Sequence, residues 1–94
     1  MTLSIIGGSL SGIELSTLTE LTNLTLLRTQ LTEINLNNQS KMKSLVLDDN
    51  LLTTIDISNL DLIESLSIKN NPLDNATKQY LDSLNGTRNL SISY

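Results

Sequence analysis

The chain repeats one pattern of apolar residues at a fixed spacing of 21 residues. In each copy two aliphatic residues flank a single intervening residue, and a leucine follows five positions later. The four copies are Leu3–Ile5 with Leu10, Leu24–Leu26 with Leu31, Leu45–Leu47 with Leu52, and Leu66–Ile68 with Leu73. A period in this range is typical of solenoids, in which each repeat stacks only on its neighbours. The sequence therefore predicts a repeat solenoid with a rod-shaped aliphatic core.

The period also divides the chain. A chain of 94 residues supports one hydrophobic core, so we expect a single domain over residues 1–94. The predicted repeats span about residues 1–20, 21–41, 42–62 and 63–83, and a C-terminal cap spans about 74–94.

Alternation within each copy predicts a short strand. Leu45 and Leu47 then face the core, while Val46 between them faces outward. Because the copies superpose, the strands lie side by side and parallel. The Asn that follows, at 50 and 71, is expected to pair with backbone groups inside the rod and so form a ladder. Thr29 is a weaker substitute and Gly8 contributes no side chain, so this ladder should fade toward the N-terminus.

The remaining half of each repeat has about ten residues, which alternate in polarity and include β-branched side chains, as in Thr53–Ile57. This predicts extended or irregular segments on the convex side of the solenoid. After Leu73 the pattern changes to a helical one. Asp74 or Asn75 can cap a helix over about residues 75–84, and Gly86 suits its end.

A last strand is predicted over about residues 89–93, with Leu90 in the place of Leu66, 24 residues later. The N-terminus shows no comparable cap, and three explanations stay open. The chain is a fragment of a longer protein, or it forms a homodimer through the uncapped N-terminal end, or Gly7, Gly8 and Gly12 let the first turn close over its own core.

The pattern L-x-x-L-x-L-x-x-N-x-L is complete in the copies that carry Asn50 and Asn71. It resembles the leucine-rich repeat superfamily, and in its short period the internalin-like and Bacteroides surface-antigen-like repeats of bacteria. The resemblance covers residues 3–73. It implies parallel strands on a concave face and a scaffold for recognition, and it implies no particular activity.

Composition excludes several functions. The net charge is −4 and the six basic residues are scattered, which disfavours nucleic-acid binding. No apolar run is long enough to cross a membrane. The sequence has no His and no Cys, so we expect no metal site, no cofactor and no enzymatic activity. The carboxylate pairs Asp48–Asp49 and Asp56–Asp61 are interpreted as solvated surface residues.

Stacking in register predicts rows of side chains on the concave face, most of them small and hydroxylic. The first two rows are Thr2, Asn23, Ser44, Ser65 and Asn89, and then Ser4, Thr25, Val46, Ser67 and Ser91. The third row is Ile6, Leu27, Asp48, Lys69 and Ser93, and beside it run Gly7, Arg28, Asp49 and Asn70.

Three aliphatic residues stand out because Ile6, Leu27 and Val46 point away from the core. A small apolar patch with charged neighbours is typical of the centre of a protein interface, although β-propensity alone also explains aliphatic residues in strands. The predicted partner-binding residues are Ile6, Leu27, Arg28, Val46, Asp48, Asp49 and Lys69.

The sequence thus favours a module that binds another protein on the concave face. Two alternatives remain: a small stand-alone inhibitor of the phage type that blocks a host enzyme, and a structural stacking unit of a larger bacterial surface or fibre protein. If Met1–Tyr94 is the full reading frame, the lack of a signal segment predicts a cytoplasmic location, and if it is a fragment, a surface location.

Overall fold

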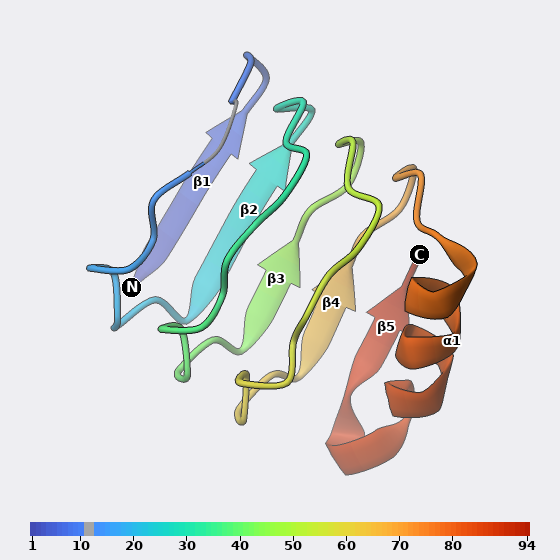
Figure 1. Ribbon diagram of the computed structural model, residues 1–94. Coiled ribbons are helices and arrows are strands. Elements are labelled where there is room, and N and C mark those ends of the chain that lie inside the picture. The colour runs from blue at the N-terminus through green and yellow to red at the C-terminus, as the bar shows by residue number, and fades with distance from the viewer. Residues whose placement is uncertain (11–12) are drawn as a thin grey trace.

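The computed structural model describes residues 1–10 and 13–94, so the role predicted for Gly12 in closing the first turn falls outside the described residues. Five parallel strands form one sheet in the order in which they occur along the chain. They are β1 (Thr2–Ile6), β2 (Asn23–Leu27), β3 (Ser44–Val46), β4 (Ser65–Ser67) and β5 (Ser91–Ser93). Between strands the chain returns across one side of the sheet, and this confirms the repeat solenoid (Figure 1).

The sheet register follows the 21-residue period from β1 to β4. Leu24 lies opposite Leu3 on one side and opposite Leu45 on the other, and Leu45 lies opposite Leu66. Leu24, Leu45 and Leu66 are buried, while the outward Val46 is half-buried. The predicted alternation of core-facing and outward residues is therefore confirmed in the central strands.

The convex segments contain no helix or strand in the described residues that precede α1. Each turn closes instead with the same backbone hydrogen bond three residues apart. The bonds run from Leu18 N to Leu15 O (2.9 Å), from Gln39 N to Leu36 O (3.3 Å) and from Leu60 N to Ile57 O (3.0 Å). The prediction of extended or irregular convex segments is confirmed.

Asn50 forms the centre of the predicted ladder. Its Nδ2 donates to Leu26 O at 2.7 Å and Leu47 O at 3.0 Å, and its Oδ1 accepts from Thr29 N at 3.0 Å. Asn71 repeats the arrangement one turn later, donating to Leu47 O at 2.9 Å and accepting from Leu52 N at 3.0 Å. These side chains satisfy backbone groups that the turn would otherwise leave buried and unpaired.

Helix α1 (Asn75–Leu84) has the predicted bounds. Asp74 caps its N-terminus, because the carboxylate accepts a hydrogen bond from Thr77 N at 2.8 Å. Leu81 is fully buried against the core, so the helix covers the aliphatic layer of the last repeat. Figure 1 shows α1 beside β5 at the C-terminal end of the sheet.

The predicted register of the last strand is wrong by two residues. Ser91 lies opposite Ser65 and Ser93 opposite Ser67, which is an offset of 26 residues instead of 24. The cause is a short 3-10 helix, Thr87–Asn89, which takes up Asn89, the first residue of the predicted strand. Asn89 therefore leaves the concave face, and Ser91 and Ser93 each belong to the row before the one predicted.

Candidate protein-binding surface

The apolar patch on the concave face is centred on two residues at the ends of β1 and β2. Ile6 lies opposite Leu27 in the sheet, so the two side chains are neighbours on the same face. Ile6 is 61% exposed and Leu27 is half-buried. Val46 lies opposite Thr25, one row away, and so borders Leu27 only diagonally. The structure thus brings Ile6 and Leu27 together and places Val46 at their margin.

The residue that follows the third row adopts a left-handed backbone in every repeat. The φ angles are 80° at Gly7, 53° at Arg28, 61° at Asp49 and 59° at Asn70. This conformation suits Gly, Asn and Asp, and it is costly for Arg. The repeated turn places these side chains along one edge of the concave face, as the register predicted.

Asp48 and Asp49 both bond to the next repeat. Asp48 Oδ1 accepts from Ser67 Oγ at 2.7 Å and from Lys69 N at 2.8 Å, and its side chain is half-buried. Asp49 Oδ1 accepts from Asn70 Nδ2 at 2.7 Å. The carboxylates predicted at the rim of the patch therefore also fasten the end of β3 to the end of β4.

Arg28 and Lys69 are exposed cations on the same edge. Within the described residues the only ion pair joins Lys41 to Glu20 and involves neither Arg28 nor Lys69. The guanidinium of Arg28 and the ammonium of Lys69 thus have no carboxylate partner in the described part of the chain, and they can reach a ligand on this face.

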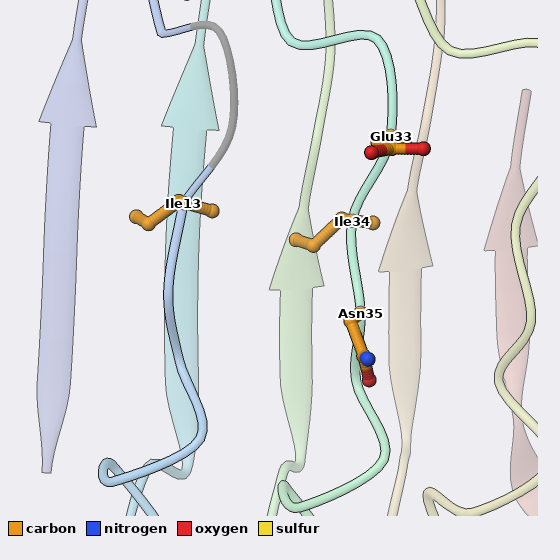
Figure 2. Close-up of a pocket in the computed structure, with 4 residues that line it drawn as sticks. All are labelled: Ile13, Glu33, Ile34 and Asn35. Atoms are coloured by element: carbon orange, nitrogen blue, oxygen red, sulfur yellow. The ribbon is translucent and has the colours of Figure 1, made fainter.

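A hollow of about 260 Å³ lies on the convex side, where the sequence predicted no site. Figure 2 shows Ile13 on one convex segment and Glu33, Ile34 and Asn35 on the next. Ile13 and Ile34 are half-buried, whereas Ile55 in the same register position is 7% exposed. The only sequence signal for this hollow was the Ile that recurs every 21 residues. That pattern indicates a core position and does not show that Ile13 and Ile34 are incompletely packed.

A second hollow, of about 380 Å³, lies where α1 meets the convex side, beside Tyr80. The phenol oxygen of Tyr80 accepts a hydrogen bond from Ile57 N at 3.2 Å and lies 3.5 Å from Asp56 Oδ1. Burial raises the pKa of Tyr80 above its ordinary value. Hydrogen bonds from Ser58 lower the pKa of Asp56. Asp56 is therefore engaged in holding a turn.

The described residues contain no group of three or more His, Cys, Asp or Glu side chains able to hold a metal ion. None of the described helices is long and apolar enough to span a bilayer. Comparison of the chain with protein-family models, with curated proteins and with solved structures gave no match. The candidate surface is therefore defined by the geometry of this chain alone.

Proposed function

We propose that the protein is a recognition module that binds another protein on the concave face of its sheet. The observation that supports this most is the adjacent pair Ile6 and Leu27, with the exposed Arg28 directly after it. An exposed aliphatic side chain on a sheet gains roughly 1–2 kcal/mol when a partner covers it. The pair is small, so a partner must also use the charged edge.

The charges on that edge indicate the chemistry of the partner. Arg28 and Lys69 offer cationic groups near the ends of β2 and β4, whereas one oxygen each of Asp48 and Asp49 is already used within the solenoid. A partner that places an apolar side chain on Ile6 and Leu27 and carboxylates beside Arg28 fits this arrangement. Such a centre with a polar rim is the usual anatomy of an interface.

The family resemblance is part of the same proposal. We propose that the chain belongs to the leucine-rich repeat superfamily, and the hydrogen bonds that the motif residues Asn50 and Asn71 make to neighbouring turns support this. Membership would support a role in recognition, since such scaffolds serve mainly to display a binding face.

The experiment begins with capture of partners by the tagged protein from cells of its source, identified by mass spectrometry and then purified. Titration with the purified partner compares the wild type with Ile6→Glu, Leu27→Glu and Arg28→Glu. Each is expected to weaken binding at least about tenfold, which corresponds to roughly 1.4 kcal/mol. Thr32→Glu, an exposed position outside the sheet, is the matched control.

Circular dichroism checks that every variant is folded. Binding that is unchanged in all three concave-face variants would rule out this face. The inhibitor and the structural stacking unit stay alternatives that no particular contact favours. Gene neighbourhood and the full reading frame test the inhibitor, and further 21-residue repeats upstream of Met1 would favour the structural unit.

A further inference from the structure

The first strand differs from the central strands because one edge of it has no partner among the described residues. Its other edge pairs with β2, as the bonds at both ends show: Asn23 N donates to Met1 O at 3.3 Å, and Gly7 N donates to Leu27 O at 2.8 Å. Backbone groups alternate in direction along a strand. The N–H and C=O groups of Thr2, Ser4 and Ile6 therefore point to the free edge.

The aliphatic layer behind this edge is also incompletely covered. Leu3, Ile5 and Leu10 are half-buried, whereas their counterparts one turn later, Leu24, Leu26 and Leu31, are all 0% exposed. The edge carries none of the usual features that prevent pairing, since residues 1–13 include no charged side chain and no Pro. The chain as a whole has a net charge of −4, whereas residues 1–13 carry no charged side chain, so these residues add no side-chain repulsion between two N-terminal ends.

We propose that two copies of this chain associate through the N-terminal end, with β1 pairing antiparallel to β1 of the second copy about a twofold axis. In the register centred on Ser4, Ser4 lies opposite Ser4, and Thr2 lies opposite Ile6. Directly opposite residues share a face of the sheet, so Leu3 and Ile5 of the two copies meet on the core side. All the outward backbone groups of Thr2, Ser4 and Ile6 then find partners.

The other end of the solenoid does not offer a comparable surface. Leu81 and Leu90 are buried under the cap, and β5 has only three residues, two of them serine. A head-to-tail contact would leave the aliphatic N-terminal end against a polar surface, and repetition would give an open filament. Contact between two N-terminal ends matches apolar with apolar and closes as a dimer.

The area is sufficient for a reversible dimer. The Cα atoms extend over 32 × 28 × 17 Å, so two end faces of roughly 17 by 30 Å would together bury on the order of 1,000 Å², near the lower bound of specific interfaces. We therefore expect an association that depends on concentration. This surface is the backbone edge of β1. It adjoins the proposed recognition face, because Ile6 has its backbone groups at the free edge and its side chain on the concave face.

Sedimentation of the 94-residue chain over a range of concentrations tests the dimer. The wild type should change from monomer to dimer, and Ser4→Pro should stay monomeric. Proline removes an N–H that faces the free edge, so it costs no bond within the solenoid. Ser4→Thr keeps the N–H and is the control that should still dimerise. Dimerisation of Ser4→Pro at the wild-type concentration overturns the proposal.

Cross-linking tests the register independently of the proline variant. The sequence has no Cys, so Ser4→Cys introduces one thiol per copy. Opposite residues in a hydrogen-bonded antiparallel pair have Cα atoms about 5.5 Å apart, within the range of a disulfide. Ser4→Cys should cross-link rapidly under mild oxidation, and Thr2→Cys should not, because its counterpart lies four residues away. Equal cross-linking of the two variants, or none in either, contradicts the register.

Amide hydrogen exchange distinguishes a second copy of the chain from any other partner that could cover the N-terminal end. In the dimer the Ser4 amide should be protected at high protein concentration and exposed at low concentration. If the occupant is instead a further segment of a longer chain or a different protein, the 94-residue chain remains monomeric and the Ser4 amide exchanges freely. Either result overturns the proposal.

Discussion

The two ends of the solenoid use the same repeat but cover their outermost aliphatic layers to different extents. At the C-terminal end, α1 and β5 bury Leu81, Leu90 and Ile92. At the N-terminal end, Leu3 and Ile5 stay half-buried beside the free edge of β1. The comparison teaches that a solenoid repeat stabilises its neighbour and cannot cover its own outer face, so an end needs a different structure or a partner.

The interior ladder shows the same gradient. Asn71 and Asn50 each donate a hydrogen bond to the turn before them. The hydroxyl of Thr29 donates to Asn50 Oδ1 at 2.6 Å. Gly8 offers no side chain, and its φ of 92° departs from the backbone of the later repeats. The first turn is thus less constrained on the inside as well as at its edge.

The largest difference between the ends should appear on truncation of one leucine at each. Leu81→Ala removes a fully buried side chain under the cap and should cost about 3 kcal/mol of unfolding free energy. Leu10→Ala removes a half-buried side chain at the open end and should cost about 1 kcal/mol. Urea denaturation at low protein concentration measures both. Equal losses would mean that the two ends are equally well packed.

Gly8→Ala should cost about 1–2 kcal/mol, because a φ of 92° is strained for any residue with a Cβ. No atom lies within 4 Å of the added Cβ, so the cost is conformational and not steric. The exposed neighbour Ser9→Ala is the control and should be nearly neutral. Thermal unfolding separates the two variants, and matching midpoints would show that the first turn does not depend on this backbone conformation.

Gln39→Leu should stabilise the N-terminal half by about 0.5–1 kcal/mol. Gln39 is fully buried, and its Oε1 has no hydrogen-bond partner in the described structure. Its Nε2 donates to Leu15 O, but that carbonyl also accepts from Leu18 N at 2.9 Å. The equivalent positions of other repeats are Leu18 and Leu60. Chemical denaturation gives the difference, and a loss of stability would show that the amide is required.

The smallest effect concerns pH at the capped end. Hydrogen bonds from Thr77 lower the pKa of Asp74 below its ordinary value of 3.8. Its carboxylate therefore stabilises the fold above that pH, and this contribution is lost as the pH falls through the lowered pKa. Asp74→Asn keeps a capping oxygen that does not titrate. The stability difference between wild type and variant should shrink in acid. A difference that stays constant from pH 6 to pH 2.5 contradicts this role.

The sequence by itself determined the features that repeat. The spacing of 21 residues predicted the parallel register of β1 to β4, the inward leucines, the Asn50 and Asn71 ladder and the non-helical convex segments of the described residues before α1. Each depends on a local pattern copied along the chain. The bounds of α1 also followed from local capping and amphipathic signals. For the candidate surface, the period put Ile6 and Leu27 side by side.

Only the tertiary structure decided what happens where the period ends or a neighbour is missing. The register of β5 depends on the number of residues in α1 and the 3-10 helix, and the 21-residue period does not predict that number. The half-exposure of Ile13 and Ile34, the burial of Gln39 and the bonds that engage Asp48 likewise depend on contacts between successive turns. A periodic pattern specifies which side chains point toward the core. How completely each side chain is buried depends on the turns that pack on either side of it.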